Sequence, residues 1–227
     1  MGKAKHPAKF TGAILKEAVE IFKNCGINGN EKVFDPFGGT GKIFFLLNFY
    51  PNLDITAFEI EPEWAAWDER VTVGNALDNK FPDSYFDIIF TSPVYGNRIS
   101  DHHNAKDGSE RNTYTHKLGR PLHPDNSGKL QWGEKYRDFH REAWAETVRV
   151  LRPNGLFLLN IKDHIRRGKV QEVSAWHYEH LTKELDLRSI VSVKVPVKGS
   201  GYGSNRKVRV FYENLFLFEK SAYLLGE

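Results

Sequence analysis

Two short turns hold the residues whose types and spacing could do chemistry. The first, DPFGGTG (residues 35–41), follows one short apolar stretch and precedes another. Glycines there let the backbone approach a ligand closely, and a helix beginning after them presents free N–H groups. The second, TSPVYG (residues 91–96), follows the apolar run FDIIF and offers a hydroxyl, a carbonyl and an aromatic ring. Together the turns predict a ligand pocket beside a substrate-binding turn.

The glycine turn departs from two common nucleotide-binding patterns. A phosphate-binding P-loop needs a glycine where Pro36 stands and a hydroxyl where Ile43 stands. GGTG also differs from the dinucleotide fingerprint G-x-G-x-x-G. The remaining ligand is S-adenosylmethionine, for which Asp35 would meet the methionine ammonium group. Glu59 would accept from the ribose hydroxyls, as the acid about 20 residues on does in dinucleotide folds. Taken alone, the glycines are equally compatible with an ordinary turn.

The elements that must position these turns follow from alternating strand and helix patterns. Short runs rich in β-branched and aromatic residues predict strands, and longer runs with helical spacing lie between them. The expected strands are 31–35, 53–59, 70–73, 86–91, 156–161, 188–197 and 208–219, and the expected helices are 42–50, 61–68, 136–151 and 174–185. Residues 152–155 (RPNG) are expected to form a turn that ends the third of these helices.

This alternation predicts an α/β fold with a mostly parallel sheet. The last two strands have only a short connection, so they should pair as a terminal antiparallel hairpin. Ligands of such sheets bind beyond the carboxyl ends of the strands, at the switch point. The two turns are therefore expected to face each other across one crevice. We expect residues 1–227 to form a single domain with an insert at about 97–133.

The insert is polar and carries neither a helical nor a strand period. Because its aromatic and basic residues argue against simple disorder, it is expected to be functional, either contacting nucleic acid or covering the cofactor. The cations expected to contact nucleic acid are Arg98, Arg111, Lys117 and Arg120, with Arg206 directly after the glycine-rich loop 199–205. Five histidines lie in or just after the insert, at positions 102, 103, 116, 123 and 140. They match no zinc pattern, so no metal site is predicted and the rings are interpreted as solvated or phosphate-contacting.

Composition sets looser bounds. The formal net charge of +3 and a pI near 8.8 allow a polyanionic partner without requiring one. The single cysteine, Cys25, excludes an internal disulfide, and no apolar run reaches membrane-spanning length. We therefore expect a cytoplasmic protein without a membrane partner.

The two turns, with further segments in the same order, resemble a known family. DPFGGTG with TSPVYG is similar to the S-adenosylmethionine-dependent amino-methyltransferases of DNA, whose second motif is Asp/Asn/Ser-Pro-Pro-aromatic. HPAKF (residues 6–10), FEIEPE (58–63), GNALD (74–78) and VLRPNG (150–155) resemble the accompanying motifs. The resemblance covers residues 6–161. It implies a Rossmann-like class I methyltransferase fold with a seven-stranded sheet, and S-adenosylmethionine as cofactor.

The resemblance also implies the roles of individual residues. Ser92, Pro93 and Tyr95 would form the catalytic turn, with Tyr95 stacking on a base flipped out of duplex DNA. The cofactor positions would be His6, Pro7, Ala8, Asp35, Phe37, Gly38, Gly39, Thr40, Gly41, Glu59, Ile60, Asn75 and Ala76. Val94 departs from the family, which has proline there, and we expect the looser turn to impair positioning without abolishing it.

Several substrates remain open. Serine at the head of the second motif favours cytosine N4, whereas Asp or Asn is commoner in adenine N6 enzymes. Guanine N2 of RNA or tRNA is a further alternative, made less favourable because the chain has no accessory RNA-binding domain. A weakly active, S-adenosylmethionine-binding nucleic-acid module is the alternative that Val94 suggests. A role in restriction-modification is expected for a DNA enzyme, but the sequence names no partner endonuclease.

Overall fold

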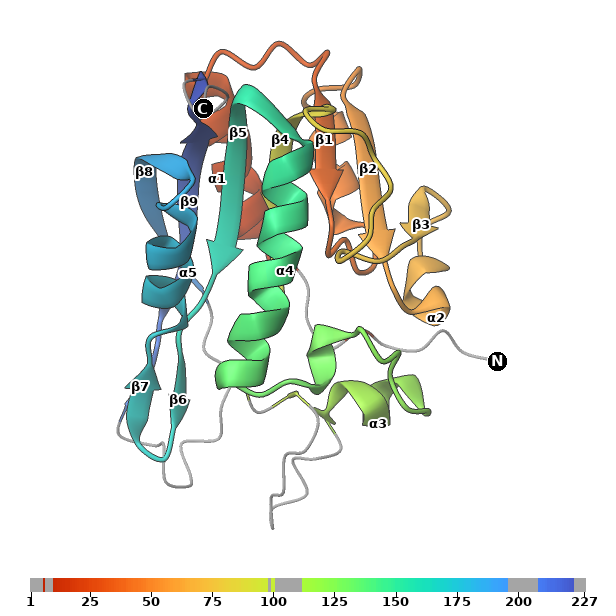
Figure 1. The fold of residues 1–227 in the computed structure, drawn as a ribbon, viewed down its shortest axis with the longest axis vertical. Coiled ribbons are helices and arrows are strands. Elements are labelled where there is room, and N and C mark those ends of the chain that lie inside the picture. Colours follow the sequence, from red (N-terminus) through yellow and green to blue (C-terminus); the bar gives the residue numbers. More distant parts are fainter. Residues whose placement is uncertain (1–5, 7–9, 98, 101–111, 196–207, 223–227) are drawn as a thin grey trace.

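The computed structural model describes residues 6, 10–97, 99–100, 112–195 and 208–222 (Figure 1). The residues Pro7, Ala8, Arg98, Arg111 and Arg206, for which the sequence predicts binding roles, lie outside this part of the chain. In chain order the elements are α1 (Gly12–Asn24), β1 (Lys32–Asp35), the 3-10 helix η1 (Lys42–Asn48), β2 (Asp54–Glu59), α2 (Pro62–Ala65), β3 (Val71–Val73), β4 (Phe86–Thr91), α3 (Tyr114–Leu118), the 3-10 helix η3 (Ser127–Lys129), α4 (Glu134–Val150), β5 (Leu151–Ile161), β6 (His164–Arg166), β7 (Lys169–Gln171), α5 (Val173–Leu181), β8 (Leu185–Lys194) and β9 (Tyr212–Lys220).

The described strands form a seven-stranded sheet in the order β3-β2-β1-β4-β5-β9-β8. Strands β1 to β5 are parallel to one another, whereas β9 is antiparallel to both β5 and β8. The predicted mostly parallel sheet with a final antiparallel hairpin is confirmed. Strand β9, although last in the chain, lies inside the sheet, and β8 forms its edge.

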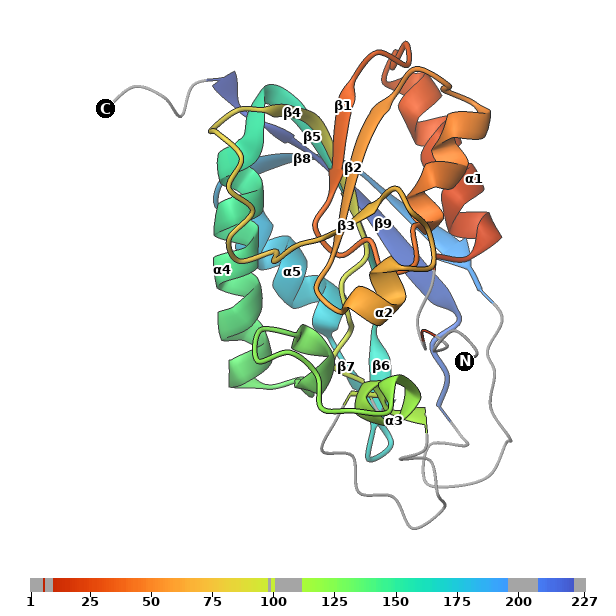
Figure 2. The ribbon, with the colours of Figure 1, turned by 90° about the vertical axis from the view of Figure 1, so that its right-hand side faces the viewer.

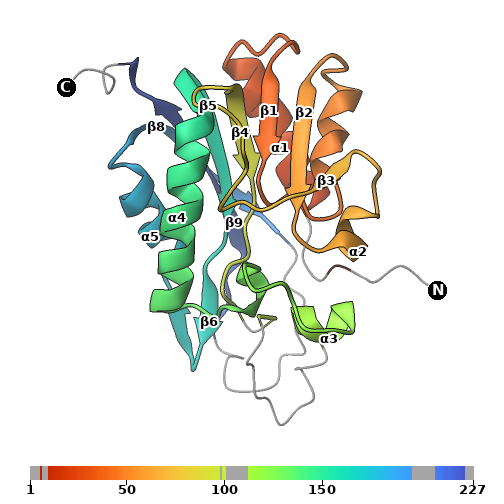
Figure 3. The same cartoon turned by 45° about the vertical axis from the view of Figure 1, so that its right-hand side comes forward.

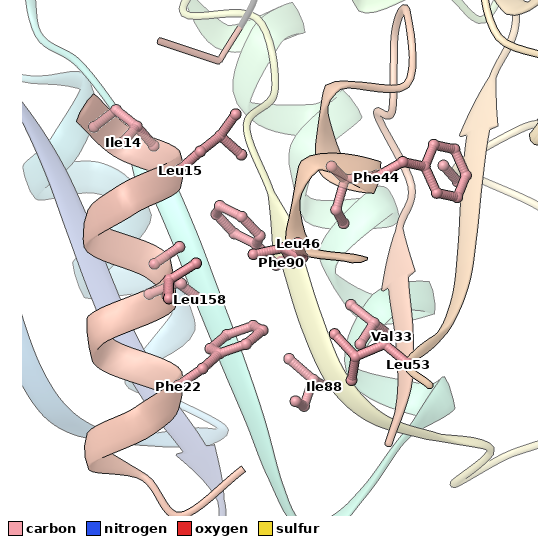
Figure 4. Close-up of a cluster of buried hydrophobic side chains, with 14 of the residues drawn as sticks. Ile14, Leu15, Phe22, Val33, Phe44, Leu46, Leu53, Ile88, Phe90 and Leu158 are labelled. Atoms are coloured by element: carbon pink, nitrogen blue, oxygen red, sulfur yellow. The ribbon is translucent and has the colours of Figure 1, made fainter. Parts of the chain in front are cut away.

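Helices cover both faces of the sheet. Figures 1 and 2 show α1 on one face and α4 with α5 on the other. Neighbouring side chains on a strand point to opposite faces, and in β9 Leu215 and Leu217 join the core under α1 while Phe216 and Phe218 join the core under α4 and α5. Figure 4 shows the first of these cores, where Phe22 of α1 lies opposite the central strands. Burial on both faces explains why strands such as FDIIF read as continuous apolar runs.

Helix α1 was not among the expected elements. Thr11 is its N-cap, and the Thr11 side chain accepts a hydrogen bond from the Ile14 N–H at 3.3 Å. One apolar face is buried against the sheet, comprising Ile14, Leu15, Ala18, Val19, Ile21 and Phe22. The i, i+4, i+7 spacing of this face was a readable helical signal.

Other expected elements differ in type or extent. The helix expected at 42–50 is η1, a 3-10 helix that begins after Gly41 in the left-handed region (φ 76°). The helix expected at 61–68 is limited to α2. The expected turn at 152–155 lies inside β5, where Asn154 takes φ 58° and the pairing with β4 shifts register between Phe86 and Ile88. The turn conformation is therefore present, but as an irregularity in a strand.

The insert and the segment after β5 contain unpredicted structure. Within the described part of the insert, α3 begins at the cap Thr113, and Asn126 caps η3. Directly after β5, β6 and β7 form a small antiparallel hairpin. Among the described helices, none combines the length and apolar character that crossing a membrane requires.

Candidate functional site

A pocket of about 880 Å³ opens where the carboxyl ends of β1, β2 and β4 meet. Both predicted turns line it, so the expected crevice is present. Figure 3 shows α3 beyond this edge of the sheet. The pocket walls include most of the predicted cofactor positions and all three predicted catalytic residues: His6, Phe37, Gly38, Gly39, Thr40, Glu59, Ile60, Ala76, Ser92, Pro93 and Tyr95.

The glycine turn is held close to β2. The Gly38 N–H donates to the Phe58 carbonyl at 2.6 Å, and a Cβ at Gly38 would lie 2.8 Å from that of Ala57. Gly39 takes φ 56°, and its open side faces the His6 ring and Glu59 Oε2, which would lie 3.7 and 3.9 Å from an added Cβ. Side chains at these two positions would therefore fill the space between the turn and the wall formed by β2.

Two buried acids flank the turn. Thr91 Oγ1 donates to Asp35 Oδ1 at 2.7 Å and the Phe37 N–H donates to it at 3.0 Å, while Oδ2 has no hydrogen-bond partner among the described residues. Burial raises the pKa of Asp35 to about 7, although both hydrogen bonds oppose the rise. Burial also raises the pKa of Glu59 to about 8, with further repulsion from Glu61 and Asp35. A cation or a hydrogen-bond donor in the pocket would favour the ionised forms.

Three further predicted cofactor positions, Asp35, Gly41 and Asn75, lie outside the pocket wall. Asp35 is behind the turn and shapes it through Phe37. Gly41 packs against Asp68, where a Cβ would lie 2.9 Å from the Asp68 Cβ. The Asn75 side chain donates to Asp125 at 2.9 Å and accepts from the Leu77 N–H at 3.0 Å. These three residues therefore support the site through turns and strands.

The second turn belongs to a side-chain network centred on Asn160. Ser92 Oγ and Tyr95 Oη lie 3.0 Å apart. Asn160 Nδ2 lies 3.1 Å from each of these oxygens and 3.1 Å from Glu213 Oε2. Withdrawal from solvent, reinforced by the charge of Glu213, raises the pKa of Tyr95 well above its ordinary value. The serine hydroxyl is thus fixed by groups from β5 and β9.

A buried hydrogen-bond chain holds the same turn from behind. Tyr136 Oη lies 2.7 Å from the Val94 carbonyl and 3.0 Å from His177 Nε2, and Trp144 Nε1 donates to His177 Nδ1 at 2.9 Å. Because indole N–H only donates, His177 Nδ1 accepts and its Nε2–H donates to Tyr136. The Tyr136 hydroxyl then donates its hydrogen bond to the Val94 carbonyl. Burial lowers the pKa of His177 well below its ordinary value, in keeping with this neutral tautomer.

His140 belongs to this buried interior, so its interpretation as a solvated or phosphate-contacting ring was wrong. The ring is fully buried in α4, and its Nδ1 lies 2.8 Å from the Tyr136 carbonyl. Burial lowers its pKa to about 3. His116 and His123 are exposed, and His102 and His103 lie outside the described residues.

The described part of the insert is anchored by hydrogen bonds and ion pairs to the segment that follows Glu59. Glu61, fully buried, accepts from the His123 N–H at 2.7 Å and from Asn126 Nδ2 at 2.8 Å. Arg120, one of the predicted nucleic-acid contacts, lies within ion-pair distance of Glu61 (2.8 Å) and Glu63 (2.6 Å). Lys117 is half-buried on α3. Further along the insert, Asp125, Asn126 and Ser127 line the pocket, so the insert forms part of the pocket wall.

Comparison with known proteins gives structural matches only. No family model matches the sequence, and no curated protein matches it. A solved S-adenosylmethionine-dependent methyltransferase from Methanosarcina mazei is similar with 13% identity and a TM-score of 0.56, covering 88% of this chain and 97% of that one. The cyclase SpnF is similar with 12% identity and a TM-score of 0.57, covering 94% and 84%. A Burkholderia thailandensis 1,6-didemethyltoxoflavin-N1-methyltransferase with bound S-adenosylhomocysteine has 16% identity and a TM-score of 0.51, covering 91% and 78%.

The chain has the Rossmann-like fold of the class I methyltransferases. None of these three structures is named as acting on DNA, and one is named as a cyclase, so the fold by itself leaves the reaction and the substrate open.

Several residues that line the pocket or hold its second turn were not predicted from the sequence. Asn160 and Glu213 were missed although each is a polar residue beside an apolar run, in LFLLNI and YENLFLF. Polar residues in buried strands usually have specific partners, and this signal could have marked both. The aromatic wall formed by Trp64 and Tyr114 around His6 was also missed. Its residues come from three separate segments, so no local pattern marked it.

Proposed function

We propose that this protein transfers a methyl group from S-adenosylmethionine to the exocyclic amino group of a base in DNA, with cytosine N4 as the favoured target. The observation that carries the proposal is the meeting of the Ser92–Tyr95 turn with the glycine turn and Glu59 in one pocket. The structural similarity to S-adenosylmethionine-dependent methyltransferases supports the same cofactor.

The residues of the first turn fit this cofactor. The glycine turn leaves the backbone bare beside Glu59, whose carboxylate suits the donors of a ribose diol. Asp35, with one buried carboxylate oxygen unpartnered, would add negative charge behind a site that receives a cationic ligand. His6 and Trp64, whose rings pack edge to face, add an aromatic part of the pocket wall. S-adenosylmethionine, when bound, supplies an electrophilic methyl group carried on a sulfonium.

The second turn fits an amino group that must be made nucleophilic. The lone pair of a base amino group is delocalised into the ring, so the group attacks poorly. Hydrogen bonds donated by its two N–H groups to Ser92 Oγ and the Pro93 carbonyl would localise that lone pair. No strong base is required, because the nitrogen becomes acidic once methylated and can release its proton to solvent. The proposed role of Ser92 and Pro93 is therefore to accept hydrogen bonds rather than to remove a proton.

The anchoring of Val94 bears on the missing proline. Proline would stiffen the turn by fixing one backbone dihedral angle. In this chain the Tyr136 hydroxyl holds the Val94 carbonyl at 2.7 Å, and the buried His177 and Trp144 hold that hydroxyl. This arrangement favours an active enzyme over the weakly active module.

The test is to identify the methylated product. The protein is incubated with labelled S-adenosylmethionine and duplex DNA, single-stranded DNA or tRNA, and the nucleic acid is digested to nucleosides. We expect label in N4-methyl-2′-deoxycytidine from DNA, and at least about 100-fold less with Ser92→Ala. Label in N6-methyl-2′-deoxyadenosine would correct the base, and label only in tRNA would overturn the DNA proposal. Cofactor binding without any label would favour the binding module.

A further inference from the structure

The hairpin formed by β6 and β7 has a tightly defined tip. Arg166 pairs with Lys169, which leaves only Arg167 and Gly168 in the turn. Both take left-handed conformations, with φ of 50° and 74°. Two consecutive left-handed residues are typical of the two-residue turn whose twist matches that of the flanking strands. The tip side chains are therefore carried on an ordered support.

The tip is rich in cations without local acids. The side chains of Arg166, Arg167 and Lys169 are exposed, and no carboxylate within the described ranges lies within ion-pair distance of them. Arg166 makes one hydrogen bond, to the Trp132 carbonyl at 3.4 Å. Seven other arginines in the described chain pair with carboxylates: Arg70, Arg120, Arg137, Arg141, Arg149, Arg152 and Arg188. Three cations without a carboxylate partner in the described chain therefore lie close together, within residues 166–169.

The same hairpin borders the pocket. His164 and Ile165, at its base, line the pocket together with Ser92 and Tyr95. Its entry is anchored because Asp163 accepts from the Ser174 N–H, at the start of α5, at 2.7 Å. Figures 1 and 2 show the hairpin extending beyond the carboxyl end of β5. Because β5 is parallel to β4, the cations lie at the same end of the sheet as the pocket.

We propose that the β6–β7 tip binds the phosphate backbone of duplex DNA next to the pocket. The inference rests on the proposed function for the identity of the polyanion. Phosphates attract cations irrespective of sequence, and the arginine fork matches phosphate oxygens in geometry. Contacts of this kind position a nucleic acid without reading its bases. The hairpin would hold the strand so that one nucleotide reaches Ser92.

Counterion release gives the test. Affinity for a short DNA duplex is measured at several salt concentrations for wild type and for Arg166→Gln/Arg167→Gln. Each lost phosphate contact lowers the slope of log affinity against log salt by about 0.9. We expect the double variant to lose about 2 from the slope and to bind at least about tenfold more weakly at low salt. Its S-adenosylmethionine affinity and melting temperature should match wild type, because both side chains are exposed.

Two matched variants make the result specific. Lys23→Gln/Lys183→Gln removes the same charge from exposed positions outside the pocket wall, in the last turn of α1 and just before β8, and its slope should stay at the wild-type value. Arg166→Lys/Arg167→Lys keeps the charge on the hairpin and should keep most of the slope. An unchanged slope in the glutamine variant of the hairpin would overturn the inference. An equal drop in the Lys23/Lys183 variant would also overturn it, because only net charge would then matter.

The proposed function can fail separately. If wild type methylates DNA but the hairpin variant keeps the full salt slope, only the hairpin inference fails. If wild type binds no duplex DNA, the proposed substrate fails and the DNA contact fails with it. Binding of tRNA alone would overturn the assignment to DNA for both.

Discussion

The two halves of the pocket are built in different ways. The half proposed for the cofactor is made by turns at the ends of β1, β2 and β3, and its shape depends on backbone conformations and on glycines that leave space. In the half proposed for the substrate, the turn after β4 is held by side chains of β5, β9, α4 and α5, with Asn160 and Tyr136 as the direct contacts. A binding surface can therefore be encoded locally, whereas the orientation of a reacting group depends on residues distant in the chain.

The sharpest separation of the halves comes from Ser92→Ala. Loss of one hydrogen-bond partner of the reacting group should lower kcat about 100- to 1,000-fold. Because Ser92 is not part of the glycine turn, S-adenosylmethionine affinity should stay within about twofold of wild type by calorimetry. Ser189→Ala, exposed on β8, is the neutral control. A matching loss of cofactor affinity would show that the two halves are not separable.

Glu59→Gln should give the complementary result. Hydrogen bonds to charged groups contribute about 1.5–3 kcal/mol, so S-adenosylmethionine should bind about 10- to 100-fold more weakly. At saturating cofactor, kcat should remain within about threefold of wild type. A large loss of kcat with unchanged cofactor affinity would place Glu59 in the substrate half instead.

The raised pKa values of Asp35 (about 7) and Glu59 (about 8) predict a pH effect confined to the cofactor half. The folded chain holds these protons more tightly than the unfolded chain does. Their contribution to stability is therefore complete below the ordinary carboxyl pKa near 4 and is lost as pH rises through about 7 to 8. A cationic cofactor favours the ionised acids, so its affinity should rise with pH over this window, by up to about tenfold per unit for each coupled proton. Measurements of S-adenosylmethionine affinity from pH 6 to 8 check this, with Glu59→Gln as the comparison. An affinity that does not change with pH in either protein would contradict the prediction.

Asn160→Asp should weaken only the substrate half. The change preserves size but replaces the donor to Ser92 and Tyr95 with an acceptor beside Glu213. We expect kcat to fall about tenfold, because the two hydrogen bonds that position the turn are lost while the turn stays anchored at Val94. Cofactor affinity is measured in parallel and should be unchanged. Stability is followed by urea unfolding, so that a fall in kcat without a fall in folded fraction identifies a positioning role.

The smallest effect is expected for Tyr136→Phe. Removing the hydroxyl releases the Val94 carbonyl and the His177 Nε2–H, at a cost of about 1 kcal/mol. The looser turn should lower kcat about fivefold, with KM for DNA changing less. Tyr50→Phe, which removes a hydroxyl bonded to the Val19 carbonyl far from the turn, is the matched control. If both variants had the same kcat, the buried chain would serve folding alone.

Much of the sheet was predictable because each buried strand is a short apolar run bounded by polar or turn residues. The strands expected at 53–59 and 86–91 were predicted in this way, and their carboxyl ends indicated where the pocket lies. Helix α1 could have been read from its spacing. By contrast, the 3-10 form of η1 and the strand character of 152–155 depend on packing and on pairing with β4. Local sequence patterns do not contain that information.

The sequence by itself determined the two turns and the acids at the ends of their strands, because glycine, proline and carboxylate at fixed spacing have few alternative uses. Only the tertiary structure decided which groups orient Ser92, since Asn160, Glu213, Tyr136 and His177 approach it from segments 40 to 120 or so residues away along the chain. It also buried His140, which the sequence had placed among solvated rings. Hydrogen bonds between distant side chains form only when the sheet and helices have packed, and for that reason the orienting half of the site could not be read from the turns alone.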